Sequence, residues 1–217
     1  MNTIEKFVVH KKFNHKHFTS TILAGNLKDK IVRDKFLISQ GLNPTNLVLA
    51  NQVHSANIKI VGNTDSGNFI DNCDGLITND KSIMLGVFTA DCVPLLITNG
   101  TIKAAIHAGW KGIYLGILEN TIEVFKNKFS VHVKDIEVYI GPHIRFCCYE
   151  VGKNFEDLFN LKLQDNKLDL SRIVFNKLKN LGLVNIFDVN KCTFCQDDYF
   201  FSYRRDKTSK RMLSLIV

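Results

Sequence analysis

The stretch AAIHAGWKGI, residues 104–113, decides the fold of this 217-residue chain, because an apolar run ends in it and a helical pattern begins. The run IKAAIH (102–107) is short and apolar, which predicts a buried strand that ends at a histidine. From Gly112 to about Lys128, apolar residues recur at helical spacing. Gly109 and Gly112 let the backbone turn sharply between the apolar run and the helical pattern. The sequence therefore predicts a strand that leads directly into a helix.

Short apolar runs and helical patterns alternate outward from this turn. Strands are predicted at 46–50, 57–61, 83–90, 93–98, 102–107, 136–140, 184–189 and 212–217, and helices at 26–40, 112–128, 152–162 and 168–180. The first helix starts with a capping Asn26 and stops at Gly41. Several steps between strands are too short for a helical crossover, so we expect a compact α/β (α+β) sandwich of mixed β-sheets flanked by helices. No repeat or linker interrupts residues 1–217, which predicts a single domain.

The composition narrows the classes of protein to which the chain can belong. It has 45% hydrophobic and 23% charged residues, no apolar run long enough to cross a bilayer and no signal-peptide pattern, so we expect a cytoplasmic protein without a membrane partner. The net charge of +7 comes from basic residues that are spread along the chain without interleaved aromatic residues, so no nucleic-acid partner is expected. The cluster YRRDKTSKR (203–211) would suit a small anionic substrate.

The six cysteines are expected to be thiols, because nothing in the sequence indicates export to an oxidising compartment. Cys192 and Cys195 form a CxxC pair, but a structural zinc site needs two further ligands, and none lies nearby in the sequence. Cys147 and Cys148 are adjacent, a spacing that rarely forms a disulfide. We therefore interpret the CxxC pair as incidental rather than metal-binding.

Three potential metal ligands lie at the ends of predicted strands. His54 is in NQVHSAN, Cys92 is in FTADCVP, and His107 is in AAIHAGW. Ligands this far apart in the sequence cannot form a local zinc finger, but they suit a catalytic zinc with one open position. The same residues would also suit a nucleophilic site, with Cys92 as thiolate and His54 or His107 as base. The residues alone leave both alternatives open.

Polar neighbours add chemistry to these candidates. Asp91 directly precedes Cys92 and could orient the site or move a proton. Gln52 lies two residues before His54, on the same side of an extended chain. Free N–H groups at the turn after His107, together with Lys111, would form an anion pocket. Trp110, the only tryptophan, is expected to have a packing role rather than a chemical one.

Six motifs in order resemble one known family: NQVHSA, DGLIT, TADCVPLL, HAGWKG, IGPHIRFCCYEVG and FFSYRRDKTSKR. They are similar to those of the multicopper polyphenol oxidase, or laccase-domain, proteins, which are also called the purine nucleoside phosphorylase/adenosine deaminase family. The resemblance covers about residues 50–211. It implies a compact α/β sandwich and a single zinc ion at His54, Cys92 and His107.

The resemblance also implies substrates and reactions. These are phosphorolysis of adenosine, inosine, guanosine and methylthioadenosine, and hydrolytic deamination of adenosine. In this scheme Asp91 is the proton carrier, Gln52 contacts the substrate, and Lys111, Arg204 and Arg205 attract phosphate. The expected partners are therefore a purine nucleoside and phosphate, and the expected assembly is a monomer or a homodimer.

Two other activities remain within the range of this family. The ligand types also suit copper and a laccase-like polyphenol oxidase, but a coupled multicopper centre needs more well-placed histidines than the seven present. The second alternative is a hydrolase that edits a peptidoglycan precursor. The chain departs from the family pattern at residues 17–36, at Ser55 where glycine is usual, and at Lys111 where arginine is common. Lysine keeps the charge at that position without the bidentate fork of arginine.

Overall fold

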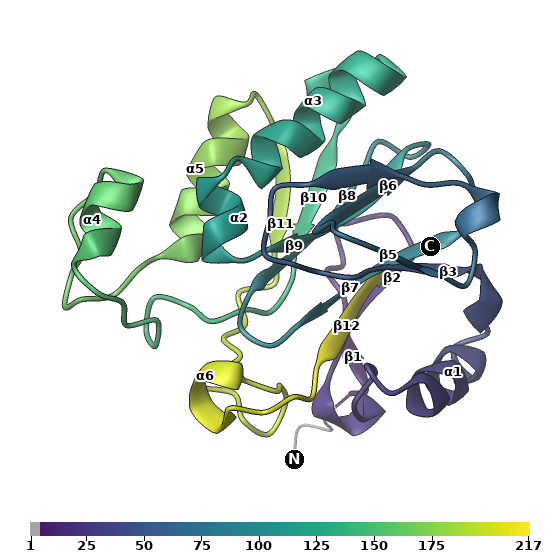
Figure 1. The fold of residues 1–217 in the computed structure, drawn as a ribbon, viewed down its shortest axis with the longest axis horizontal. Coiled ribbons are helices and arrows are strands. Elements are labelled where there is room, and N and C mark those ends of the chain that lie inside the picture. The colour runs from purple at the N-terminus through teal and green to yellow at the C-terminus, as the bar shows by residue number, and fades with distance from the viewer. Residues whose placement is uncertain (1–4) are drawn as a thin grey trace.

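The apolar runs form the centre of two six-stranded sheets that pack face to face, as seen in a computed structural model that describes residues 5–217 (Figure 1). The first sheet contains, in spatial order, β1 (Phe7–Val8), β2 (His17–Ser20), β12 (Met212–Ile216), β7 (Met84–Thr89), β3 (Leu47–Ala50) and β5 (Phe69–Ile70). The second contains β11 (Asn185–Asp188), β10 (Glu137–Ile140), β8 (Val93–Thr98), β9 (Lys103–Ala108), β6 (Gly75–Thr78) and β4 (Ile58–Ile60).

Each sheet combines parallel and antiparallel neighbours. In the first sheet β3 runs parallel to β7, whereas β12 runs antiparallel to both β2 and β7. In the second sheet β8 pairs antiparallel with β9 and β10, whereas β10 pairs parallel with β11. The predicted sandwich of mixed sheets is thus confirmed, and every predicted strand is present with its ends shifted by at most one residue.

Helices cover the outer faces of both sheets (Figure 1). The helices are α1 (Lys30–Ser39), α2 (Trp110–Tyr114), α3 (Ile117–Phe129), α4 (Asn154–Phe159), α5 (Leu170–Asn180) and α6 (Tyr203–Asp206). α3 and α5 pack on the second sheet, and α1 packs on the first. Strand β7 is therefore buried on both faces. Leu85 and Val87 face the core between the sheets, whereas Met84 and Phe88 face α1. A strand with two buried faces has a continuous apolar run in its sequence, so such strands could be located from the sequence.

Two helix predictions were partly wrong. The first helix begins at Lys30, because the Asp29 side chain caps it by accepting hydrogen bonds from the N–H groups of residues 31 and 32. Asn26 instead accepts from the N–H of Arg211 at 3.0 Å. The predicted helix at 112–128 is two helices, α2 and α3, because Gly116 adopts a left-handed φ of 93° and ends the first.

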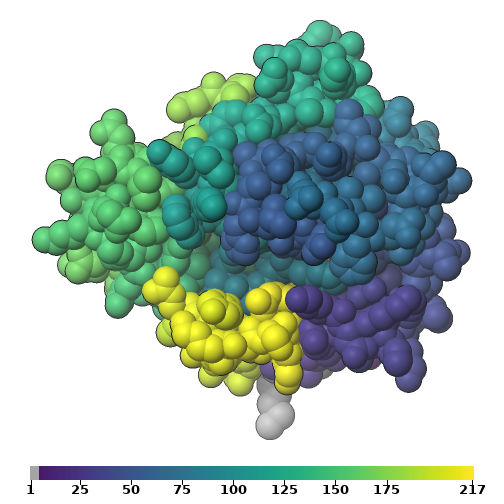
Figure 2. Space-filling view, in the orientation of Figure 1, coloured from purple at the N-terminus to yellow at the C-terminus, as the bar shows by residue number. Residues whose placement is uncertain are grey.

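Strand β2 is buried along its whole length although three of the four residues in its sequence, HFTS, are polar. Thr19 Oγ1 shares hydrogen bonds with Ser214 Oγ at 2.8 Å and Tyr139 OH at 3.1 Å, so its burial leaves no polar group unpaired. Apolar periodicity cannot detect such a strand, and β1, β5 and β6 were also not predicted. In Figure 2 the N-terminal segment (purple) and the C-terminal segment (yellow) lie side by side, as the pairing of β2 with β12 requires. Within the part of the chain that the structure describes, no helix combines the length and the apolar character needed to cross a bilayer.

His143, in the loop after β10, is fully buried and held in its neutral form. Its Nδ1–H donates to the carbonyl oxygen of Gly141 at 2.8 Å, so Nε2 accepts the hydrogen bond from Ser171 Oγ at 2.7 Å. Burial lowers the pKa of His143 to about 4. Protonation of this side chain therefore opposes folding.

Acidification from pH 7 to pH 5 is expected to lower the free energy of unfolding by about 2 kcal/mol through His143 alone. The unfolded histidine gains its proton near pH 6.5, whereas the folded one gains it near pH 4, so stability falls as the pH drops through this interval. Urea unfolding at both pH values measures the effect. A His143→Asn variant should lose about 2 kcal/mol less than the unmodified protein, since other groups such as His17 titrate in both. Equal losses in the two proteins would contradict the prediction.

Candidate active site

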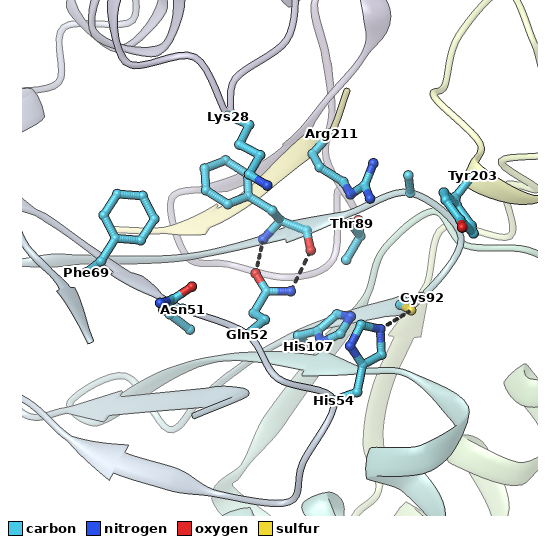
Figure 3. Close-up of a pocket in the computed structure, with 13 residues that line it drawn as sticks. Lys28, Asn51, Gln52, His54, Phe69, Thr89, Cys92, His107, Tyr203 and Arg211 are labelled. Atoms are coloured by element: carbon cyan, nitrogen blue, oxygen red, sulfur yellow. Dashed lines mark hydrogen bonds between the residues drawn. The ribbon is translucent and has the colours of Figure 1, made fainter. Parts of the chain in front are cut away.

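The three proposed metal ligands meet at one end of the sandwich, although they come from separate segments (Figure 3). His54 lies in the loop after β3, Cys92 directly precedes β8, and His107 lies on β9. Antiparallel pairing of β8 with β9 sets Pro94 opposite His107, which brings Cys92 near that histidine. The ligand atoms of the three side chains all lie within 4.8 Å of one another, and Cys92 Sγ is 3.9 Å from His54 Nε2.

A buried carboxylate, Asp74, orients two of these ligands. Asp74 immediately precedes β6 and is completely buried. Its Oδ1 accepts a hydrogen bond from His107 Nδ1 at 2.7 Å and from the N–H of His54 at 3.0 Å. Because Nδ1 of His107 donates this bond, Nε2 is the ring nitrogen that is left to bind a metal. Carboxylate–histidine pairs of this kind fix ring orientation at metal sites.

Asp74 also fixes the loop that carries His54. The N–H groups of Val53 and Ser55 donate to Asp74 Oδ2 at 3.2 and 2.6 Å, and Ser55 Oγ donates to it at 2.8 Å. His54 itself adopts a left-handed φ of 59°, which is unfavourable for a non-glycine residue. The hydrogen bonds to Asp74 hold this conformation, and Ser55 contributes two of them, through its N–H and its Oγ.

The site favours a thiolate at Cys92. Burial raises the pKa of this thiol, but the charge and hydrogen bond of His107, with a further contribution from His54, lower it to about 6. Burial lowers the pKa of His107, but the Cys92 thiolate and Asp74 raise it to about 9. Burial likewise opposes ionisation of Asp74, yet hydrogen bonds from His107 and Ser55 lower its pKa to about 2. A thiolate donor beside two imidazoles suits a soft or borderline metal ion.

A cavity of about 510 Å³ opens next to the three ligands. Phe69, Phe88 and Tyr203 give it aromatic walls, and Lys28 and Arg211 bring positive charge into it. In Figure 3, Lys28 and Arg211 lie across the cavity from the cluster of His54, Cys92 and His107. A cavity of this size with aromatic walls and a few charged groups suits a small organic anion or an aromatic ligand together with an anion.

Gln52 and Asp91 are placed near the ligands but are occupied by protein partners. The Gln52 side chain pairs with the backbone of Phe88 through two hydrogen bonds of 2.7 Å, so it holds the His54 loop against β7. Asp91 accepts hydrogen bonds from Thr193 Oγ1 at 2.7 Å and from the N–H of Arg204 at 2.6 Å. It thereby joins the Cys92 turn to the C-terminal part of the chain. Its role as a proton carrier stays a prediction.

The three cations predicted to attract phosphate lie outside the lining of this cavity. Lys111 is exposed on α2. Arg204 donates to the carbonyl oxygen of Glu150 at 2.8 Å, and Arg205 forms an ion pair with Asp206 and hydrogen bonds with backbone carbonyls. Their phosphate-binding role also stays a prediction. The cations that do line the cavity, Lys28 and Arg211, were not singled out, although Arg211 belongs to the basic cluster noted in the sequence.

Asp74 is the functional residue that sequence reasoning most clearly missed. It opens the motif DGLIT, and the available signal was a carboxylate directly before a short buried strand. Trp110, in contrast, packs as expected: its ring meets that of Phe155 edge-on, with 4.9 Å between centroids.

Known proteins resemble this chain in both sequence and fold. The family described as multi-copper polyphenol oxidoreductase laccase matches residues 25–217. A purine nucleoside phosphorylase of Clostridium acetobutylicum is 40% identical over 178 residues, which cover 76% of this chain and 74% of the relative. The purine nucleoside phosphorylase YfiH of Escherichia coli is 33% identical over 196 residues, which cover 84% of this chain and 78% of the relative.

Two crystal structures show the same arrangement of sheets and helices. YlmD of Geobacillus stearothermophilus superposes with a TM-score of 0.89 at 24% identity, covering 100% of this chain and 97% of its own. The protein NMB0706 of Neisseria meningitidis gives a TM-score of 0.83 at 27% identity, covering 98% of each chain. The likeness therefore extends over nearly the whole chain.

Proposed function

The chain belongs to the multi-copper polyphenol oxidoreductase laccase family, and on that premise we propose that it is a zinc-dependent purine nucleoside phosphorylase that also deaminates adenosine. The proposed nucleosides are adenosine, inosine, guanosine and methylthioadenosine. The observation that carries the proposal is the two-histidine, one-cysteine cluster, which opens into a cavity with aromatic walls and two cations. The names of the relatives from Clostridium acetobutylicum and Escherichia coli support the choice of reaction.

The donor set fits zinc. Two imidazoles and one thiolate leave a fourth position of a tetrahedral ion for water or substrate, as in catalytic zinc sites. When bound, zinc would polarise a phosphate oxygen or lower the pKa of a water molecule. The ligand types would also suit copper, but within residues 5–217 the other group of close ligand atoms consists of four cysteines, not histidines. The proposal is therefore zinc rather than a coupled copper centre.

The cavity offers a place for each reactant. Lys28 and Arg211 would hold phosphate, while the rings of Phe69, Phe88 and Tyr203 would contact the purine. In phosphorolysis, a phosphate oxygen forms a bond to C1′ of the ribose, the bond from C1′ to the purine nitrogen breaks, and the purine leaves with a proton. In deamination, water adds to C6 of adenosine and ammonia leaves.

Incubation of the zinc-loaded protein with inosine and phosphate is expected to release hypoxanthine and ribose 1-phosphate. Without phosphate this release should stop, because the attacking oxygen belongs to phosphate, whereas adenosine should still be converted to inosine. Chromatography of the products measures both reactions. If a zinc-loaded sample turned over none of the four nucleosides, the proposal would be wrong. Phenol oxidation by a copper-loaded sample, with no nucleoside turnover, would favour the polyphenol oxidase instead.

A matched pair of variants locates the phosphate in the same assay. Arg211→Gln should raise the KM for phosphate about 10-fold, which corresponds to loss of about 1.4 kcal/mol of binding. Lys111→Gln should leave this KM unchanged, because Lys111 is exposed on α2 and does not line the cavity. The reverse pattern would move the phosphate to the turn between β9 and α2, as predicted from sequence.

A further inference from the structure

Four cysteines from two distant parts of the chain come together at the end of the second sheet. Cys147 and Cys148 lie in the loop after β10, and Cys192 and Cys195 lie in the loop after β11. β10 and β11 are parallel neighbours, so both loops leave the sheet at the same edge. The sulfur of Cys147 is 3.3 Å from that of Cys195, 3.6 Å from that of Cys192 and 3.5 Å from that of Cys148.

We propose that Cys147, Cys148, Cys192 and Cys195 form a structural Zn²⁺ site of four thiolates, separate from the site at His54, Cys92 and His107. All four sulfur atoms lie within 4.8 Å of one another. Four sulfurs around a tetrahedral zinc, at about 2.3 Å from the metal, are separated by about 3.8 Å, which is close to the spacing found here. The CxxC pair thus has the two further ligands that its local sequence lacks.

The arrangement suits one shared ion better than two disulfides. The sulfur of Cys195 is 3.0 Å from that of Cys148 and 3.3 Å from that of Cys147, so each thiol has more than one near neighbour. A disulfide joins two sulfur atoms exclusively and in its own geometry. Two disulfides here would either join the adjacent Cys147 and Cys148 to each other or join each of them to Cys192 or Cys195. Tetrahedral sites of four thiolates are typical of zinc or of iron–sulfur centres. Binding would displace the thiol protons into water as the four Zn–S bonds form.

The ion would hold together two loops that support the active site. Thr193, next to Cys192, donates to Asp91 and accepts a hydrogen bond from the Arg205 side chain through its carbonyl oxygen. Asp91 in turn precedes Cys92. Tyr149, next to Cys148, packs under the guanidinium of Arg204. A metal that links the loops would therefore fix the C-terminal segment against the Cys92 turn without touching the cavity.

Cys92→Ala provides the background in which to test the second site, because it removes a ligand of the first. After purification with a reductant and zinc, this variant should contain about one zinc per chain by elemental analysis. Substitution with Co²⁺ should give the intense thiolate-to-cobalt absorption bands of a four-thiolate site. Adding Cys147→Ser and Cys195→Ser should remove both signals. Adding Cys73→Ser instead, which changes a buried cysteine outside the cluster, should preserve them.

Three results would overturn the proposal. One is a Cys92→Ala protein that is folded, contains no zinc and has four freely alkylated thiols in the cluster. Another is an intact mass and peptide map that show disulfides among the four. The third is a cobalt spectrum that survives Cys147→Ser and Cys195→Ser. The spectrum of Cys92→Ala alone decides the question if the variants with additional substitutions do not fold. None of these measurements uses nucleoside turnover, so the outcome is independent of the proposed phosphorylase activity.

Discussion

Cys92→Ala is expected to lower kcat/KM for phosphorolysis at least about 1000-fold, a loss of about 4 kcal/mol of transition-state stabilisation. The substitution removes the only thiolate from the cluster of His54, Cys92 and His107, and leaves two neutral imidazoles to hold the ion. Bound zinc should fall by one ion per chain. Elemental analysis and steady-state kinetics with inosine measure the two effects. Cys73→Ala, which removes a thiol elsewhere, is the control for both.

Cys92→His separates the metal site from the alternative in which Cys92 is a nucleophile. Three histidines can hold catalytic zinc, so this variant should keep the ion and retain measurable phosphorolysis. A nucleophilic thiolate cannot be replaced by an imidazole in this way. An unchanged zinc content in Cys92→Ala, or activity lost by Cys92→His while its zinc remains, would each contradict the assignment of Cys92 as a metal ligand.

Asp74→Asn should have the second large effect, because it acts on folding and on metal binding together. Both oxygens of Asp74 accept hydrogen bonds, from the N–H groups of residues 53–55, from Ser55 Oγ and from His107. An amide group has one oxygen, so its NH₂ must face at least two donors in either orientation. We expect a loss of about 3 kcal/mol in the free energy of unfolding and a 10–100-fold weaker affinity for zinc.

Urea unfolding and zinc competition with a chelator measure these two losses. Asp71→Asn is the matched control: Asp71 is exposed, accepts one hydrogen bond from Asn51, and should change stability by less than about 0.5 kcal/mol. The difference between the unmodified protein and Asp74→Asn should also shrink below pH 3.8. The folded Asp74 has a pKa of about 2, so its stabilising charge is present above pH 3.8 and is lost as the pH falls toward 2. Equal unfolding energies at pH 7 would refute the role of Asp74.

The parts of the fold that could be predicted are those whose sequence reflects burial. β7, β8 and β9 are apolar on both faces, so their runs identify them, and the histidine and cysteine at their ends mark the site. β2 could not be found in this way, because Thr19 satisfies its polarity through partners about 120 and 195 residues away. The break between α2 and α3 depends on the single left-handed Gly116, which a helical pattern does not reveal.

The missed site residues share a physical cause, since each acts through a contact that is distant in sequence. Asp74 contributes to the site only because β6 lies beside β9, which brings the Asp74 carboxylate to His107. Lys28 and Arg211 reach one cavity from opposite ends of the chain. The two cysteine pairs come together because β10 pairs parallel with β11, and the local spacing of the cysteines does not reveal that pairing.

The position of β12 has a consequence for the order in which the protein can fold. This strand lies between β2 and β7, so the first sheet is in two separate parts until residues 212–216 insert between them. Arg211 joins the cavity wall only at that step. Until residues 211–216 have been synthesised, the cavity is therefore incomplete and one edge of β7 has no partner strand. Strand pairing over this sequence distance is slow, so the cavity is completed late in folding.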